Sequence, residues 1–316
     1  MRVPGGTLTN EQFRAVCTAS EDLGDGTLEL TSRANFQIRG LPEGAQFELG
    51  ERLAEVGLLP SLTHERVRNI IAAPLSDDTQ AVVDELDRTL CATPELADLP
   101  GRFLVTVGAE VSGLGGDIGL VGNALLLAGA DSGLRPADPV AAVIEAARIF
   151  AASRGTAWRL SEVPEVVAEI TAALGTPTAE RIPVAVTTPL PGPAGDKFVV
   201  GAPLGRLDQN QAAALADLGG ELRLTPWRSL VAPGAPDLTG LGLIIDPDSA
   251  WHGVTACTGR PGCAKSLADV RADATRWLGT PHTRPVHWAG CARRCGRPSG
   301  DVMEFVATGD GYEETS

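Results

Sequence analysis

Lysine is nearly absent from this chain, which has two lysines against 24 arginines, and only 4% of its 316 residues are aromatic. Acidic residues exceed basic ones and give a net charge of −14, so the chain lacks the basic surplus that nucleic acid attracts. No apolar run is long enough to span a bilayer, the longest being "NALLLAGA". We therefore expect neither nucleic acid nor a membrane as a partner.

Cysteine is also scarce, and four of the six cysteines lie in "ACTGRPGCAKS" (256–266) and "HWAGCARRCGRPSG" (287–300). The start of the chain lacks the basic-then-apolar pattern of a signal peptide, so we expect a cytoplasmic protein. A reducing compartment disfavours a disulfide framework. The cysteine pairs are therefore expected to bind metal or to take part in catalysis.

Local patterns predict an alternation of helices and strands. Helices are expected from Thr9, where Gln12 completes a capping box, and from Asp208, where Gln211 does the same. Further helices are predicted over 45–57, 77–91, 138–152 and 162–174, and strands over 27–31, 35–39, 102–108 and 124–129. The Pro- and Gly-rich segment "TTPLPGPAGD" (187–196) is predicted to be a linker.

The second part of the chain echoes the first. A capped helix, a Leu-Gly break and an L-x-L-T strand precede an arginine in both, Arg33 in one and Arg228 in the other. "GRFLVTVGAEVSGLGGDIGLV" also has a counterpart in "TRPVHWAGCARRCGRPSGDVMEFV". We interpret this as a duplication of about 160 residues, although common strand–loop patterns also match by chance.

The spacing Cys257-x5-Cys263-x27-Cys291-x3-Cys295 favours an iron–sulfur cluster. Structural zinc sites usually have C-x2-C or C-x4-C pairs, so the x5 and x3 spacings fit zinc less well. A 4Fe-4S cluster needs four thiolates and close backbone approach, which the glycines of these loops allow. Nearby basic residues can offset its negative charge: Arg260, Lys265, Arg293 and Arg294. Cys17 and Cys91 lie in helical patterns and are expected to be small core residues.

With these loops, the chain resembles the sulfite and nitrite reductase family, whose cluster lies beside a sirohaem. "LTSRANFQIRGL" is similar to that family's first anion- and macrocycle-binding strand, and "ERVRNIIAAP" to its R-N-[IV] segment. "RVRNIIAAPLSD", "ACTGRPGC" and "VHWAGCARRCGRP" resemble the precorrin-3B synthase branch of the family most closely.

The resemblance implies an α+β fold with two pseudo-repeated halves, each having a ferredoxin-like half-domain and a mixed α/β domain. The implied boundaries are 1–62, 63–180, 181–238 and 239–316, with the cluster in the last. The four cysteines named above match the cluster ligands, and Cys295 should lie nearest the macrocycle. The residues expected to contact a tetrapyrrole are Arg33, Gln37, Arg66, Arg68, Asn69, Arg102 and Arg228. We expect Arg33, Arg68 and the cysteine loops to line one cleft.

One position departs from the reductase pattern. Those enzymes carry two basic residues one apart after a Leu-Pro, whereas "LPGRFLV" keeps Arg102 and has Leu104 at the second position. A small anion needs several charge-assisted donors. The departure therefore counts against sulfite or nitrite as the substrate.

The resemblance to the precorrin-3B synthase branch implies a monooxygenase of cobalamin biosynthesis. It would hydroxylate precorrin-3A at C20 and close a γ-lactone, using O2 and electrons from NADH or a donor protein. An additional non-haem iron would need two of His64, His252, His282 and His287 together, and their spacing suggests no pair. The sequence names no catalytic base. The alternatives are a sirohaem-dependent sulfite or nitrite reductase, and a non-catalytic iron–sulfur protein that binds a tetrapyrrole or senses redox state.

Overall fold

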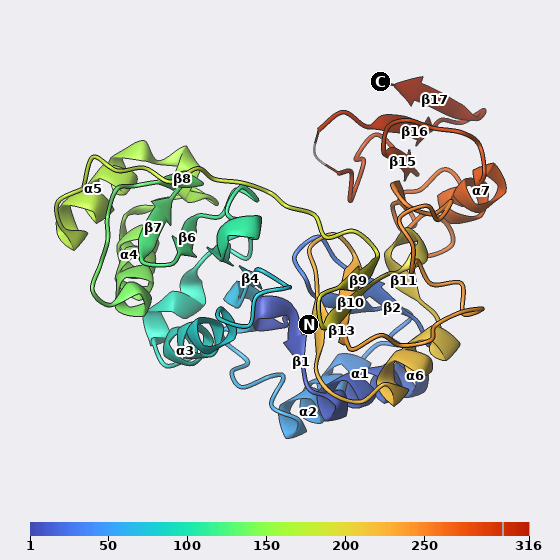
Figure 1. Cartoon of the computed structure of the whole chain (residues 1–316), viewed down its shortest axis with the longest axis horizontal. Helices are drawn as coiled ribbons and strands as arrows, with labels where there is room; N and C mark the ends of the chain where they lie inside the picture. Colours follow the sequence, from blue (N-terminus) through green and yellow to red (C-terminus); the bar gives the residue numbers. More distant parts are fainter. Residues whose placement is uncertain (299, 316) are drawn as a thin grey trace.

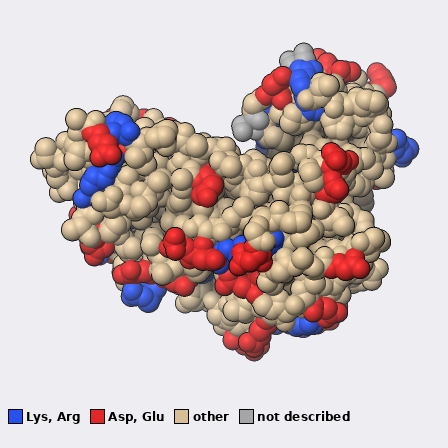
Figure 2. All heavy atoms as spheres, viewed as in Figure 1, with Lys and Arg blue, Asp and Glu red and all other residues tan. Residues whose placement is uncertain are grey.

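The computed structural model describes residues 1–298 and 300–315, which form three lobes (Figure 1). A central lobe combines the segment Pro4–Glu55 with the segment Gly192–Pro233. A first α/β lobe lies between these segments in sequence, and a second, smaller α/β lobe holds the C-terminal strands. No helix in the described ranges has both the length and the apolar character that a bilayer crossing requires. On the face shown in Figure 2, acidic side chains are spread over all three lobes.

The central lobe contains two copies of one motif. The first copy comprises η1 (Pro4–Gly6), β1 (Thr7–Leu8), α1 (Asn10–Leu23), β2 (Leu28–Leu30) and β3 (Phe36–Ile38). The second comprises η6 (Pro203–Gly205), β11 (Arg206–Leu207), α6 (Gln209–Asp217), β12 (Leu222–Leu224) and β13 (Ser229–Pro233). Both predicted capping boxes are present, at Thr9 with Gln12 and at Asp208 with Gln211. Helix α2 (Ala45–Glu55) follows the first copy.

The two copies exchange strands. Strand β1 pairs antiparallel with β12, whereas β11 pairs antiparallel with β2. Each copy therefore completes the sheet of the other, and the buried apolar side chains of both form one core. The repeated order of elements agrees with two related copies in the central lobe.

The first α/β lobe has a sheet in the order β4-β5-β6-β7-β8. Its strands are β4 (Ile70–Ala72), β5 (Val105–Val107), β6 (Ile118–Val121), β7 (Ala124–Leu127) and β8 (Ala130–Asp131). The pairs β4/β5 and β5/β6 are parallel, and the following pairs are antiparallel. The accompanying helices are η2 (Glu65–Val67), α3 (Gln80–Cys91), η3 (Pro94–Asp98), η4 (Ala109–Val111), α4 (Pro139–Ser153), η5 (Leu160–Glu162) and α5 (Pro164–Leu174).

The second α/β lobe repeats this order with fewer elements. Its sheet consists of β14 (Val254–Ala256), β15 (Val286–Ala289), β16 (Met303–Ala307) and β17 (Tyr312–Thr315). The pairs β14/β15 and β15/β16 are parallel, and β16/β17 is antiparallel. One helix, α7 (Val270–Trp277), connects β14 to β15, as α3 connects β4 to β5. The order parallel, parallel, antiparallel therefore occurs in both halves.

Two sequence predictions need correction. The supposed linker contains β9 (Gly192–Ala194), which pairs with β10 (Lys197–Gly201) at the edge of the central sheet, where proline is tolerated. Arg33 and Arg228 are not equivalent either. In the two hairpin turns, the left-handed position is Ala34 (φ 53°) in one and Arg228 (φ 57°) in the other, so Arg33 corresponds to Trp227.

Candidate iron–sulfur site

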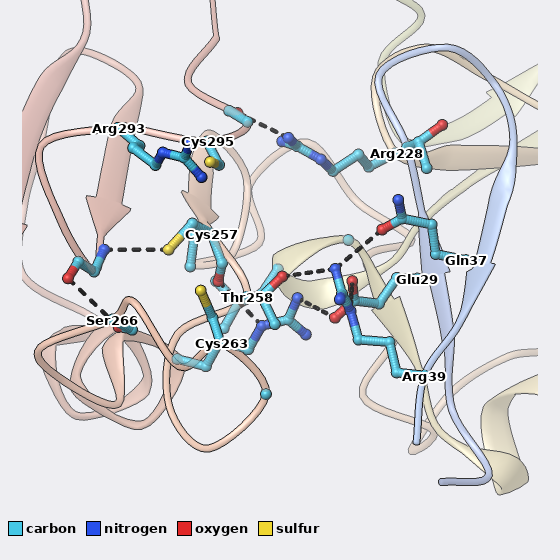
Figure 3. A pocket seen from close by; sticks show the side chains of 18 of the residues that line it. Glu29, Gln37, Arg39, Arg228, Cys257, Thr258, Cys263, Ser266, Arg293 and Cys295 are labelled. Atoms are coloured by element: carbon cyan, nitrogen blue, oxygen red, sulfur yellow. Dashed lines mark hydrogen bonds and ion pairs between the residues drawn. The ribbon is translucent and has the colours of Figure 1, made fainter. Parts of the chain in front are cut away.

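The four C-terminal cysteines line one cavity of about 390 Å³ between the second α/β lobe and the central lobe. Figure 3 shows Cys257, Cys263 and Cys295 on one side of this cysteine cavity, and residues of the central hairpins on the other. The central lobe contributes Gln37, Arg39 and Arg228 to the lining. The structure therefore brings the predicted ligands together with two of the predicted tetrapyrrole-binding residues.

The parallel pairing of β14 and β15 explains why the cysteines meet. The carboxyl ends of parallel neighbours lie at one edge of a sheet, so the loops after Ala256 and Ala289 meet there. The Cys257 N–H continues the ladder by donating to the Trp288 carbonyl at 2.9 Å. The loops approach so closely that a Cβ on Gly290 would collide with the Ser266 side chain. Glycine is required at this position for the two loops to pack.

The donor set of the cavity fits a 4Fe-4S cluster. Cys257, Cys263 and Cys291 are half-buried and Cys295 is exposed, and all four are free thiols. The Gly290 N–H already donates to Cys257 Sγ at 3.1 Å, the kind of bond that stabilises a thiolate ligand. No three His, Cys, Asp or Glu side chains of the described residues converge on a point suited to a single metal ion. The four thiols instead surround a cavity.

Basic side chains dominate the charge around the cavity. Five cationic residues and one carboxylate line it: Arg39, Arg228, Lys265, Arg271, Arg293 and Glu29. Five positive charges and one negative leave a surplus of four in a chain whose net charge is −14. Burial, followed by the charge of Arg271, lowers the pKa of Arg228. A bound anionic cluster or carboxylate would relieve this concentration of positive charge.

The basic residues predicted to surround the cluster divide into two groups. Lys265 and Arg293 line the cavity. Arg260 faces a neighbouring hollow and donates from Nε to the Ser266 carbonyl at 2.7 Å, and Arg294 pairs with Glu304 at 3.1 Å. Sequence reasoning missed Arg39 and Arg271. Because alternate residues of a strand share a face, the position of Gln37 indicates that of Arg39.

Arg228 and Gln37 reach the cavity from different hairpins. Arg228 Nη2 donates to the Gly296 carbonyl at 2.8 Å, next to Cys295 in sequence. Gln37 lies in β3, is exposed, and accepts a hydrogen bond from Arg39 Nη2 at 3.0 Å. The Gln37 amide group and the Arg228 guanidinium therefore both face the cluster loops (Figure 3).

The other predicted tetrapyrrole contacts lie outside the cysteine cavity, at the junction of the central lobe with the first α/β lobe. Arg33 donates to the carbonyls of Gly101 (3.1 Å) and Arg102 (3.2 Å), and burial lowers its pKa. Arg66 is exposed, and Arg102 lies over the Trp158 ring with 6.0 Å to the ring centroid.

Asn69 is buried at the same junction. Its Nδ2 donates to the carbonyls of Arg66 (3.1 Å) and Gly101 (3.2 Å). Its buried Oδ1 has no partner among the described residues. The amide is therefore held by the protein backbone and not exposed to a ligand.

Arg68 does not contribute to the expected cleft. Its side chain is 3% exposed, and Nε and Nη2 each bind a carboxylate oxygen of Asp87 at 2.7 Å. Nη1 donates to the Leu58 carbonyl at 3.0 Å. Because its donors are used within the protein, Arg68 has a structural role in place of the predicted substrate contact. The expectation that Arg33 and Arg68 share a cleft with the cysteines is corrected accordingly.

The histidines provide no site for an additional iron within the described residues. His64 is buried between Thr93 and the side chains of Ser61 and Thr63. His287 is fully buried beside Thr255, and burial lowers its pKa to about 4. His64 and His287 belong to different α/β lobes.

The remaining two cysteines are packed in protein. Cys17 belongs to the central core, and Cys91 packs against the core of the first α/β lobe. Burial raises the pKa of Cys17 to about 12 and that of Cys91 to about 11. Both thiols are therefore protonated at neutral pH, as expected of core residues.

Leu104 lies directly before β5 in the first α/β lobe. Its side chain is 4% exposed and packs in a small apolar cluster with Ile71, Val111 and Trp227. The position where a second basic residue was expected beside Arg102 is therefore apolar and shielded from solvent.

Comparison with known proteins agrees with this fold. Residues 1–56 match the nitrite/sulfite reductase ferredoxin-like half domain. The chain is 26% identical to a ferredoxin–nitrite reductase of Synechococcus elongatus, over 94% of this chain and 73% of that protein. It is also 26% identical to a precorrin-3B synthase of Sinorhizobium sp, over 97% of this chain and 76% of that protein.

Among solved structures, the Mycobacterium tuberculosis NirA protein superimposes with a TM-score of 0.72 at 21% identity. The match covers 99% of this chain and 72% of NirA. The mixed α/β fold predicted from the sequence is confirmed by this match.

Proposed function

We propose that this chain, which is related to the nitrite and sulfite reductases and shares their fold, is an iron–sulfur monooxygenase of the precorrin-3B synthase type. Its substrate would be precorrin-3A or a similar tetrapyrrole with several carboxylate arms. One oxygen atom of O2 would enter the product as the C20 hydroxyl, and the ring A acetate would close a γ-lactone. The other oxygen atom would leave as water, with two electrons and two protons supplied from NADH and solvent through a donor protein.

The cysteine cavity supplies the first part of this proposal. Cys257, Cys263, Cys291 and Cys295 would hold a 4Fe-4S cluster, which provides one-electron transfer when bound. The Gly290 N–H would hydrogen-bond the Cys257 thiolate, as it already does the thiol. The surplus of basic side chains around the cavity would offset the negative charge of the cluster.

The facing hairpins supply the substrate-binding part. Arg228 presents a guanidinium that can bind a carboxylate bidentately, and its partial burial strengthens such a bond. Arg39 fixes the Gln37 amide through the hydrogen bond at 3.0 Å. Arg33, Arg66 and Arg102 would extend this basic surface across the central lobe toward the other carboxylate arms, with Asn69 holding the Arg66 backbone behind it.

The observation that carries the choice of substrate is the burial of Leu104. A small anion such as sulfite or nitrite would need several charged donors in a dry pocket. At the position where the second such donor was expected, Leu104 lies among Ile71, Val111 and Trp227. This apolar closure disfavours sulfite or nitrite and is compatible with the broad apolar face of a tetrapyrrole.

Isotope labelling tests the proposal. Anaerobically purified protein, supplied with precorrin-3A, reductant and ¹⁸O₂, should form a product carrying one labelled oxygen atom. An unlabelled product, or reduction of nitrite or sulfite at a rate that accounts for the electrons consumed, would refute the monooxygenase. Product formation would also exclude a purely binding or sensing protein.

A sirohaem-dependent nitrite or sulfite reductase is the second candidate. It is favoured by the match to the Synechococcus elongatus ferredoxin–nitrite reductase, at the same identity as the match to precorrin-3B synthase. The visible spectrum of purified protein separates the two. A sirohaem gives a strong visible band, whereas a cluster alone gives a broad brown shoulder.

A further inference from the structure

Glu29 is a buried carboxylate in the middle of β2, between two buried leucines. Its side chain is 7% exposed. Burying a carboxylate is unfavourable unless charged partners and hydrogen bonds replace its hydration. The partners of Glu29 therefore show what holds the charge there.

Both oxygens of this carboxylate bind arginines. Arg39 Nε donates to Oε2 at 2.6 Å, and Arg271 Nη2 donates to Oε1 at 2.7 Å. Arg39 directly follows β3, the strand that pairs with β2, and Arg271 lies in α7 of the second α/β lobe. The carboxylate therefore connects two lobes through a pair of charge-assisted hydrogen bonds.

Each of the two arginines also reaches the first cysteine loop. Arg271 Nε donates to the Cys257 carbonyl at 3.2 Å. Arg39 Nη2 donates to Thr258 Oγ1 at 2.8 Å. Two consecutive residues of the loop are thus attached to one carboxylate, and Figure 3 shows Arg39 between Glu29 and Thr258. Arg39 also binds Gln37, so the same group contacts the cavity wall opposite the cysteines.

We propose that Glu29 is the positioning residue of the cluster, acting through Arg39 and Arg271 to fix the Cys257 loop against the hairpin that carries Gln37. This inference rests on the proposed function, because it requires a cluster bound by Cys257. Glu29 lines the cavity, but both of its carboxylate oxygens bind arginines, so it is not proposed as a ligand. Glu29 binds Arg39 and Arg271, and other N–H groups of these two arginines bind the Cys257 loop.

Glu29→Gln is the variant of choice because it keeps the shape and removes the charge. One amide oxygen can accept from one arginine, but the amide NH2 faces the donors of the other. One arginine should therefore release, and the Cys257 loop should loosen. We expect the cluster to be lost to an iron chelator about 10-fold faster, which is the lower end of the effect when a partner of a metal ligand is removed.

The redox potential gives a second measurement that does not depend on turnover. Removing one negative charge beside the cavity favours the reduced, more negative cluster. The midpoint potential of Glu29→Gln should therefore shift to a more positive value in an electron paramagnetic resonance titration. Glu29→Asp restores the charge and should return both measurements toward the wild type.

Asp87→Asn is the matched control, because Asp87 also pairs with a buried arginine but lies in the first α/β lobe. It should lower thermal stability and leave chelation rate and potential unchanged. The inference is overturned if Glu29→Gln keeps the wild-type chelation rate and potential, or if Asp87→Asn changes them equally. Wild-type protein with cluster but no ¹⁸O incorporation would refute the proposed monooxygenase alone, whereas wild-type protein without acid-labile sulfide would overturn both.

Discussion

The two α/β lobes share a topology but differ in the residue that follows the first strand of each sheet. In the first lobe, the Ala73 N–H donates to the Val107 carbonyl at 2.8 Å after β4. In the second, the Cys257 N–H donates to the Trp288 carbonyl at 2.9 Å after β14. Ala73 therefore occupies the position of Cys257, the first of the proposed cluster ligands. The same backbone frame carries a methyl group in one half and a thiol in the other.

The two lobes differ in another respect. In the first, Leu104 and Val111 form a small apolar cluster with Trp227, whereas thiols, glycines and basic residues line the cavity at the second. The cores differ as well. Within the described residues, 26 buried apolar side chains form the core of the first lobe, whereas the core of the second has six of its own and Leu204 from the central lobe. We therefore expect the first lobe to be stable on its own core, and the second to gain stability from a bound metal cluster.

Of the changes predicted here, loss of a cluster ligand should have the largest effect, and it should affect the second α/β lobe and not the first. Wild-type protein purified anaerobically should contain about four iron atoms and four sulfides per chain. Cys263→Ser or Cys291→Ser should abolish both and increase hydrogen exchange in β14–β16, while β4–β6 stay protected, because only the second lobe relies on the cluster. Iron and sulfide analysis with exchange mass spectrometry measures this.

The control for the cysteine variants is Cys91→Ser, which changes a thiol that packs against the core of the first lobe. It should retain the cluster. Stoichiometric zinc without acid-labile sulfide in the wild type would contradict the cluster assignment. Equal exchange in the two sheets after cluster loss would contradict the proposed difference in stability between the lobes.

Features determined by residues close together in the sequence could be predicted from it. The capping boxes at Thr9 and Asp208 depend on a residue three positions away, and both formed as predicted. The meeting of the cysteine loops could be anticipated because each pair follows a strand and lies among glycines. The mixed α/β fold followed from the resemblance and is confirmed.

Features determined by distant partners could not be predicted. Arg68 matched a substrate-binding pattern, but its partner Asp87 lies on α3, and only packing reveals the pair. The Glu29 network joins β2, the end of β3 and α7, which are separated by up to 242 positions in sequence. Charge patterns cannot show whether an arginine faces solvent or another side chain. The linker prediction missed β9, because Gly192 and Pro193 near the end of that segment form an edge strand.

Arg68→Ala should have the next largest effect, which is a loss of stability. It leaves the Asp87 carboxylate without its partner, and breaking a buried pair from one side costs about 3–5 kcal/mol. Because the Asp87 side chain is 18% exposed, we expect a loss of about 3 kcal/mol in the free energy of unfolding. Denaturant titration measures it. Cluster content should remain at the wild-type level.

Arg88→Ala is the control for Arg68→Ala, since Arg88 follows Asp87 on α3 and has 72% of its side chain exposed. Its stability should change by less than about 0.5 kcal/mol. An Arg68→Ala protein of wild-type stability that binds the tetrapyrrole more weakly would reinstate Arg68 as a substrate-binding residue.

The smallest effect is expected from Arg228→Ala, which compares the two hairpin turns. Ala34 shows that the equivalent turn accepts alanine at φ 53°, so the fold should tolerate the change. Loss of a charged hydrogen bond to a substrate carboxylate should weaken binding of precorrin-3A by about 1.5–3 kcal/mol. Arg33→Ala should weaken it less, because Arg33 is held by the Gly101 and Arg102 carbonyls.

Fluorescence titration of the anaerobic protein with precorrin-3A measures the difference between the two hairpins. Arg276→Ala serves as the control, because this α7 arginine has 73% of its side chain exposed and pairs with Asp273. It should bind precorrin-3A as the wild type does. If Arg228→Ala binds as tightly as the control while Arg33→Ala binds more weakly, the carboxylate arms lie over the first hairpin. The substrate would then bind beside the first α/β lobe, away from the cysteine cavity.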